Sequence, residues 1–165
     1  QPLDAAEYAL ACAKEAGATT ILNPAPAADL PASMIALCDY VTPNETEAEA
    51  ISGVTVVTAD DAIKAAEVIL DKGAGAAIIT LGDNGCLYHD GTSPVHVPAL
   101  SAGPVIETTG AGDAFNGGLA AALAEGKLPL DAIRFGTATA AISVTRSGTA
   151  PSMPSRNEIA ILLGH

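Results

Sequence analysis

The first part of the chain alternates between helical and extended patterns of apolar residues. Apolar side chains recur at helical spacing from Leu3 to Gly17, and glycine commonly follows a helix C-terminus. Residues 19–22 change to a β-branched pattern, which predicts a strand. The proline-rich segment 23–26 ends this strand, and a short helix over 33–37 and a strand over 39–42 follow.

The middle of the chain contains the clearest helical pattern. Residues 46–51 predict a helix that stops at Gly53. A longer helix begins after Thr58, its expected N-cap, and keeps one apolar face as far as Gly73. Residues 76–81 then form a continuous apolar run of strand length, which is typical of a strand covered on both faces.

The last half contains an extended excursion and then only helices. Residues 85–89 and 95–98 lie on either side of Asp90-Gly91, a dipeptide that favours a hairpin turn, so we expect an antiparallel excursion. Further helices are predicted over residues 113–124, 130–145 and 157–163. Because strands and helices alternate over most of the chain, the class is predicted to be α/β with a largely parallel sheet and without an internal domain boundary.

Composition and charge narrow the possible functions. Of 165 residues, 49% are hydrophobic and 16% are charged, which excludes a disordered chain. Aromatic residues make up 3% and tryptophan is absent, so a bound sugar would be held by hydrogen bonds and not by stacking. The net charge of −12 disfavours nucleic acid and anionic membranes as partners. Helix N-termini can still attract a small polyanion such as a nucleotide.

The cysteines and the apolar runs indicate a cytoplasmic protein. Cys12, Cys38 and Cys86 are odd in number, widely spaced and without a metal-like spacing to histidine, so we expect reduced thiols. No apolar run reaches the roughly 18 residues of a membrane span, and no signal peptide pattern is present.

The strongest chemical motif is a glycine-rich turn that leads into the helix expected near Asp113. Free N–H groups there would converge on an anion, and they belong to Gly110, Ala111, Gly112 and Asp113. Asp113 is also placed to accept a proton from an attacking hydroxyl group. The alternative is that Asp113 only caps the helix. The motif is neither a Walker A loop nor a dinucleotide fingerprint, because Phe115 stands where the third glycine of that fingerprint belongs.

Two further motifs follow the predicted strands. Asn44 and Glu47 have the spacing of a capping box, and the functional alternative is that Glu47 orders water around Mg²⁺. The buried strand at 76–81 ends in a polar loop that is either a simple turn or the wall of a nucleotide pocket. This loop consists of Thr80, Leu81, Gly82, Asp83, Asn84 and Gly85.

Five motifs in this order resemble the ribokinase-like sugar kinase family. They are Asn-Pro-Ala-Pro-Ala at 23–27, Pro-Asn-Glu-Thr-Glu-Ala at 43–48, Thr-Leu-Gly at 80–82, the glycine-rich motif at 108–117 and Val-Thr-Arg-Ser-Gly-Thr-Ala-Pro-Ser-Met-Pro at 144–154. The Gly-Ala-Gly-Asp element marks the family as a whole. The first, second and last motifs favour its ribokinase branch.

The resemblance implies a ribokinase-like three-layer α/β/α fold and transfer of the γ-phosphoryl group of ATP to the 5-hydroxyl of D-ribose. Asp113 is then the catalytic base, the backbone from Gly110 to Asp113 is the anion hole, and Glu47 orders water around Mg²⁺. ATP contacts are implied for Asn44, for the loop from Thr80 to Gly85, and for Gly112 and Thr137. A monovalent cation, normally K⁺, is implied beside the anion hole. Its ligands match Glu107, Thr109, Ser143, Arg146, Gly148 and Ser152.

Two departures from the family pattern matter. Position 107 is usually Asp, and the extra methylene of Glu107 changes its reach toward the cation. Family members are also about twice as long, and the sugar-binding Asp, the Gly-Gly-Lys-type sugar loop and the β lid of their first half do not occur here. Residues 1–165 are therefore expected to be the C-terminal, ATP-binding half, inactive alone and associating with copies of itself or with the other half. The alternatives are a non-catalytic nucleotide-binding or regulatory module and another sugar or nucleoside kinase.

Overall fold

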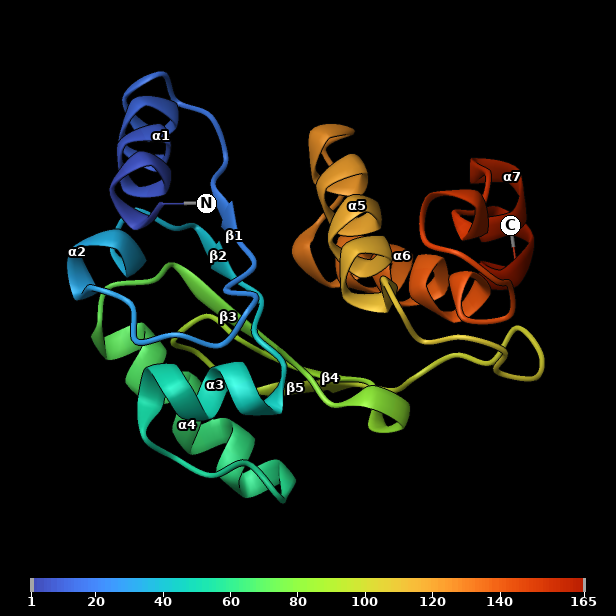
Figure 1. Cartoon of the computed structure of the whole chain (residues 1–165), viewed down its shortest axis with the longest axis horizontal. Helices are drawn as coiled ribbons and strands as arrows, with labels where there is room; N and C mark the ends of the chain where they lie inside the picture. Colours follow the sequence, from blue (N-terminus) through green and yellow to red (C-terminus); the bar gives the residue numbers. More distant parts are fainter. Residues whose placement is uncertain (1, 165) are drawn as a thin grey trace. The chain divides into compact units, whose positions relative to one another are not determined.

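Short strands pair in chain order to form one sheet (Figure 1). The computed structural model describes residues 2–164. The strands are β1 (Ile21–Leu22), β2 (Tyr40–Val41), β3 (Ala76–Thr80), β4 (Cys86–His89) and β5 (Val95–Val97). β1, β2 and β3 pair in parallel, β4 pairs antiparallel to β3, and β5 lies beside β4. The predicted α/β class with a largely parallel sheet is confirmed, and β4 and β5 form at the residues predicted for the excursion.

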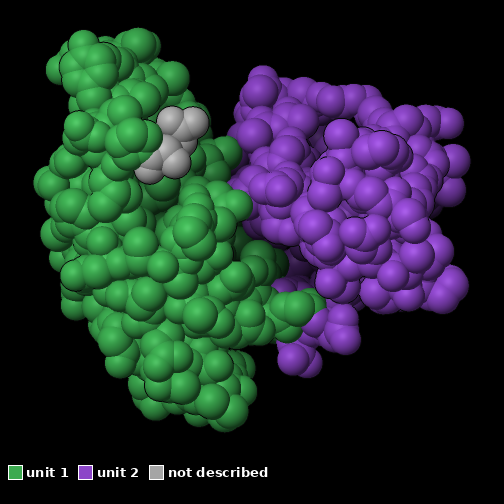
Figure 2. Space-filling model, viewed as in Figure 1, with its two compact units in different colours: residues 1–82, 86–96 green, residues 83–85, 97–165 purple. Residues whose placement is uncertain are grey.

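The chain divides into two compact units (Figure 2). Unit 1 comprises residues 1–82 and 86–96, and unit 2 comprises residues 83–85 and 97–165. Unit 1 contains most of the sheet with the first four helices, whereas unit 2 is built mainly from helices.

Unit 1 packs its helices against the sheet through small and aliphatic side chains. The helices are α1 (Leu3–Glu15), α2 (Ala32–Ile35), α3 (Glu45–Ser52) and α4 (Ala59–Asp71). Alternate strand residues Ala77 and Ile79 join Leu87 in one buried cluster with Ile35 and Ile69. Burial of each such isoleucine side chain stabilises the fold by about 1.5–3 kcal/mol. These helices agree with the predicted ranges to within a few residues.

Side-chain caps explain where three of the helices begin. Asn44 and Glu47 form a reciprocal capping box at α3, and Thr58 and Asp61 form another at α4. A third box forms at α7 (Arg156–Leu163), where Ser155 is the N-cap. The predicted caps at Asn44 and Thr58 are confirmed.

Unit 2 is held together by a close contact between α5 (Ala111–Ala124) and α6 (Pro129–Ser143). A Cβ atom at Gly118 would lie 2.9 Å from the Cα atom of Gly136. A Cβ atom at Gly136 would lie 2.8 Å from the carbonyl oxygen of Phe115. Such distances are shorter than van der Waals contact, so this helix pair requires glycine at both positions.

The last helix, α7 (Arg156–Leu163), is tied to the turn before it by charged groups. The carboxylate of Glu158 accepts the N–H of Ser155 at 2.8 Å and pairs with the guanidinium of Arg146. These contacts lower the pKa of Glu158 to about 2, with the Ser155 N–H making the largest contribution and Arg146 the next. Arg156 pairs with Glu125 and lies over the ring of Phe135, 5.7 Å from its centre.

The cysteines of the described residues are all free thiols. Cys12 is exposed, whereas Cys38 and Cys86 are buried. Burial raises the pKa of the Cys38 thiol to about 11, so this thiol stays protonated and unreactive. Among residues 2–164, no helix is both long enough and apolar enough to cross a membrane.

We expect Gly118→Ala to destabilise the chain by roughly 1–3 kcal/mol, because the new methyl group forces α5 away from α6. The matched control is Gly117→Ala, one residue earlier on α5, where an added Cβ meets no atom within 4 Å. This control should be neutral or stabilising because alanine favours helix over glycine. Urea unfolding of both variants measures the difference, and equal stabilities would contradict the assignment of this contact.

We expect the acid sensitivity of the fold to depend on Glu158. Its native pKa of about 2 lies below the ordinary value of 4.5, so the ionised carboxylate stabilises the folded state above that ordinary value. This stabilisation is lost as the pH falls toward the native pKa. Melting curves between about pH 6 and pH 2 should therefore show a smaller loss of stability for Glu158→Gln than for the wild type. Glu67→Gln, an exposed carboxylate on α4, is the control, and parallel curves for all three proteins would contradict the role of Glu158.

Candidate functional site

The glycine-rich turn starts α5 two residues earlier than the sequence predicted. The helix begins at Ala111, and its N-cap is Gly110 with a φ of +81°. A left-handed backbone at this point favours glycine. Asp113 is therefore the third residue of the helix and not its first.

The alternative that Asp113 only caps the helix is wrong. At the N-cap of α5, no side chain accepts a hydrogen bond from the first backbone N–H groups of the helix. Within residues 2–164, the Asp113 carboxylate accepts no hydrogen bond, and the side chain is exposed. An exposed, uncommitted carboxylate in the first turn of a helix is free to act on a bound molecule.

The backbone amides of the turn are available to an anion, with one exception. The N–H of Ala111 donates to the carbonyl of Thr108 at 3.1 Å, so the prediction that this amide is free is wrong. The N–H groups of Gly112 and Asp113 find no acceptor among the described residues. These two amides lie at the positive end of the α5 dipole, where a phosphate is favoured. We call the turn from Gly110 to Asp113 the cradle.

The segment before the cradle is joined to the turn after α6, at residues 144–149. Ile106 and Glu107 donate their N–H groups to the carbonyl of Val144 at 2.7 and 3.2 Å. The Oε2 atom of Glu107 accepts the N–H of Gly148 at 2.8 Å. Two of the predicted cation ligands, Glu107 and Gly148, are thus in direct contact.

The remaining predicted cation ligands make local contacts in unit 2. The Ser143 hydroxyl donates to the carbonyl of Ala140 at 2.8 Å, and the buried Ser152 hydroxyl donates to that of Thr149 at 2.6 Å. Arg146 uses its guanidinium to pair with Glu158, and Thr109 is exposed. Over the part of the chain that is described, no group of three or more His, Cys, Asp or Glu side chains gathers to hold a metal. The backbone carbonyls of the turn and Glu107 are oxygen donors, the type that suits hard cations.

A second group of predicted residues meets in unit 1 at the carboxyl ends of β2 and β3. The Asn44 side chain accepts the N–H of Glu47, and Glu47 Oε2 accepts the N–H of Asn44, both at 2.9 Å. Asn44 also forms a parallel bridge with Thr80, whose N–H donates to Pro43 at 2.9 Å. The capping interpretation is confirmed for this pair. Glu47 is only 7% exposed, and its second carboxylate oxygen is the one left for a ligand.

The loop after β3 turns sharply through a short 3₁₀ helix over Gly82–Asn84. Gly85 follows with a φ of +86°, and a Cβ atom there would lie 2.6 Å from the amide nitrogen of Ala99. Leu81 and Gly82 belong to unit 1, whereas Asp83, Asn84 and Gly85 belong to unit 2. The other predicted nucleotide contact, Thr137, is buried in α6 and donates its hydroxyl to the carbonyl of Ile133 at 3.0 Å.

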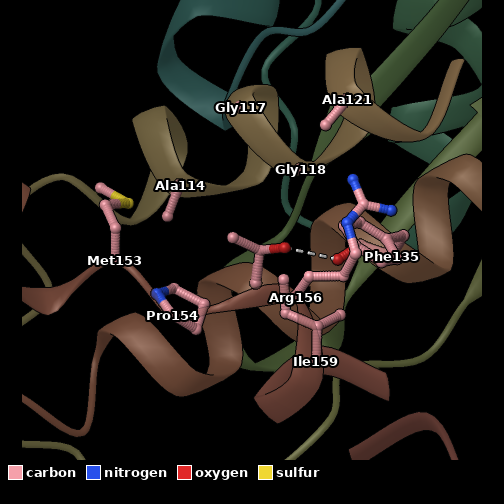
Figure 3. Close-up of a pocket in the computed structure, with 10 residues that line it drawn as sticks. Ala114, Gly117, Gly118, Ala121, Phe135, Met153, Pro154, Arg156 and Ile159 are labelled. Carbon is pink, nitrogen blue, oxygen red and sulfur yellow. Dashed lines mark hydrogen bonds between the residues drawn. The ribbon is translucent and has the colours of Figure 1, made fainter. Parts of the chain in front are cut away.

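An open pocket of about 280 Å³ lies along one face of α5 (Figure 3). Small residues of α5 form one wall, and Phe135, the segment after η2 (Ala150–Ser152), Arg156 and Ile159 form the others. Its lining is Ala114, Gly117, Gly118, Ala121, Phe135, Thr139, Met153, Pro154, Arg156 and Ile159. The sequence analysis did not anticipate this pocket, and none of its lining residues was a predicted site residue. The small residues of α5 at helical spacing are the only signal that could have indicated it.

The sequence is similar to those of sugar kinases. Residues 1–156 match the family described as pfkB family carbohydrate kinase. The chain is 44% identical over 164 residues to a ribokinase of Haemophilus influenzae, which covers 99% of this chain and 53% of the relative. It is 39% identical over 154 residues to a deoxyribokinase of Salmonella typhi, which covers 93% of this chain and 50% of the relative.

A solved structure shows the same fold. The Arabidopsis thaliana ribokinase complexed with ribose and ATP matches with a TM-score of 0.94 and 30% identity, over 99% of this chain and 53% of that one. The chain thus spans about half the length of the relatives it matches. Because the family match extends over nearly the whole sequence, the chain belongs to the pfkB family of carbohydrate kinases.

Proposed function

We propose that this chain is the ATP-binding, catalytic-base half of a kinase that phosphorylates the 5-hydroxyl of D-ribose. The observation that carries the proposal is the cradle, where the free amides of Gly112 and Asp113 lie beside the uncommitted Asp113 carboxylate. The likeness to the ribokinase of Haemophilus influenzae and to the Arabidopsis thaliana ribokinase solved with ribose and ATP supports ribose and ATP as substrates.

In the proposed reaction, Asp113 accepts the proton of the sugar hydroxyl as its oxygen attacks the γ-phosphorus. The new bond joins the sugar oxygen to this phosphorus, and the bond to the bridging oxygen of ADP breaks. The N–H groups of Gly112 and Asp113 hydrogen-bond to the oxygens of the transferring group and stabilise its charge. Positioning and electrostatics thus supply the catalysis, as they do in phosphoryl transfer generally.

The proposed cofactor residues follow from the family resemblance and from the chemistry of their donors. Asn44, Thr137 and the loop from Thr80 to Gly85 would contact ATP. Glu47 retains one carboxylate oxygen for water bound to Mg²⁺, which would neutralise phosphate charge. The oxygen donors at Glu107 and in the turn 144–149 would hold a monovalent cation together with Thr109, Ser143 and Ser152.

A second candidate substrate is deoxyribose. The likeness to the Salmonella typhi deoxyribokinase, at 39% identity, supports it nearly as well as the other relatives support ribose. Both candidates share the same hydroxyl chemistry at Asp113, so the proposed mechanism applies to either one.

The proposal also covers partners and location. Because the chain spans about half of its relatives, we propose that the sugar-binding part lies outside residues 1–165. We further propose that the chain associates with that part or with copies of itself through the edge strands β1 and β5. The proposed location is the cytoplasm.

We expect the chain to bind a non-hydrolysable ATP analogue while forming no ADP with ribose. Calorimetry tests the first expectation and a coupled ADP assay the second. Gly112→Ala should weaken analogue binding without loss of stability, because the added methyl group meets no protein atom within 4 Å and lies where the phosphate approaches. Gly117→Ala is the matched control. The binding proposal fails if the wild type does not bind the analogue, and ribose-dependent turnover by this chain alone would contradict its assignment as half of the enzyme.

We expect Asp113→Asn to lower kcat by roughly 10²–10⁴ with little change in analogue affinity, because asparagine keeps the size of the side chain but cannot accept the proton. The assay needs a complete kinase, such as a chimera in which this chain replaces the matching segment of the Haemophilus influenzae ribokinase. Asp131→Asn removes a first-turn carboxylate from α6 and is the control. A near-normal kcat for Asp113→Asn would remove this residue from the mechanism.

A further inference from the structure

One carboxylate joins two backbone segments that meet close to the cradle. The hydrogen bonds of Ile106 and Glu107 to Val144 fasten one end of the turn 144–149. The Glu107 side chain then fastens its other end by accepting the N–H of Gly148 at 2.8 Å.

The same turn reaches the cradle. A Cβ atom at Gly110 would lie 3.2 Å from the Cγ2 atom of Thr149, the residue directly after Gly148. On its other side, the turn is held by the pair of Arg146 and Glu158. A displacement of Gly148 would therefore also displace Thr149 relative to Gly110. The amides that follow Gly110 would shift in turn.

The length of the glutamate side chain makes the direct contact possible. Aspartate at position 107 would withdraw the carboxylate by one carbon–carbon bond, about 1.5 Å. The distance from the carboxylate to the Gly148 nitrogen would then exceed the range of a hydrogen bond unless the turn moved. This contact involves protein atoms alone, so it does not require a bound cation.

We propose that Glu107 is a positioning residue that holds the cradle in its phosphate-binding geometry through Gly148 and the turn 144–149. The inference rests on the proposed function, because the anion that the cradle serves is the phosphoryl group of ATP. Glu107 works here as a hydrogen-bond acceptor, so glutamine can replace it, whereas alanine and aspartate cannot.

The test compares Glu107→Ala, Glu107→Asp and Glu107→Gln with the wild type in the full chain. Asp131→Ala, which removes an exposed carboxylate from the same unit, is the matched control. Each protein is titrated with a non-hydrolysable ATP analogue and with adenosine, which lacks phosphates. The titrations are followed by amide NMR spectra in potassium and in tetramethylammonium buffers.

Glu107→Ala and Glu107→Asp should weaken analogue binding roughly tenfold or more, with adenosine binding unchanged and Glu107→Gln close to the wild type. The difference should persist in tetramethylammonium. Without any ligand, the amide signals of Gly112 and Asp113 should move in the alanine variant and stay in place in the control. Equal loss of analogue and adenosine binding would indicate a general structural defect and overturn the proposal.

Two other results are decisive. If the variants differ from the wild type only in potassium, a bound cation orders the cradle and the hydrogen bond from Gly148 to Glu107 does not, so the positioning role is wrong. If the wild type binds no analogue but the ligand-free signals of Gly112 and Asp113 still shift in Glu107→Ala, the positioning role holds and the proposed ATP function fails.

Discussion

The packing of unit 2 depends on the close approach of α5 to α6, where glycine backbone atoms are in direct contact. Gly118 and Gly136 let the two helices meet at distances that no Cβ atom could occupy. Because α5 carries the cradle at its N-terminus, this contact also sets the direction in which the first amides of α5 point. The packing that stabilises the unit is thus the same packing that orients the candidate site.

The start of α5 differs physically from the starts of α3, α4 and α7. Those three helices bind their first amides with side chains of Asn44, Thr58 and Ser155. A left-handed glycine starts α5 and offers no side-chain acceptor, so the amides of Gly112 and Asp113 stay available. These two amides belong to exposed residues, and an anion at the helix N-terminus could accept hydrogen bonds from them.

Much of the local structure could be predicted from residue patterns alone. The capping boxes were predictable because side chains three residues apart decide them without distant contacts. The glycine-rich turn that leads into α5 was predictable for the same reason, whereas its use as an anion site stays a prediction. The hydrogen-bond partner of each amide could not be predicted. The Ala111 N–H donates to the carbonyl of Thr108, and the helix starts two residues earlier than expected. Those details depend on how the turn closes on itself.

The sequence by itself determined the α/β class, the order of the elements and the kinase family, because periodicity and ordered motifs are properties of the chain. Tertiary structure alone decided that Glu107 meets Gly148, that Asn44 bridges to Thr80, and that a pocket forms along α5. It also divided the chain into two units, which no composition change marks. The physical reason is that these contacts join residues far apart in the chain, so no local pattern contains the distance between them.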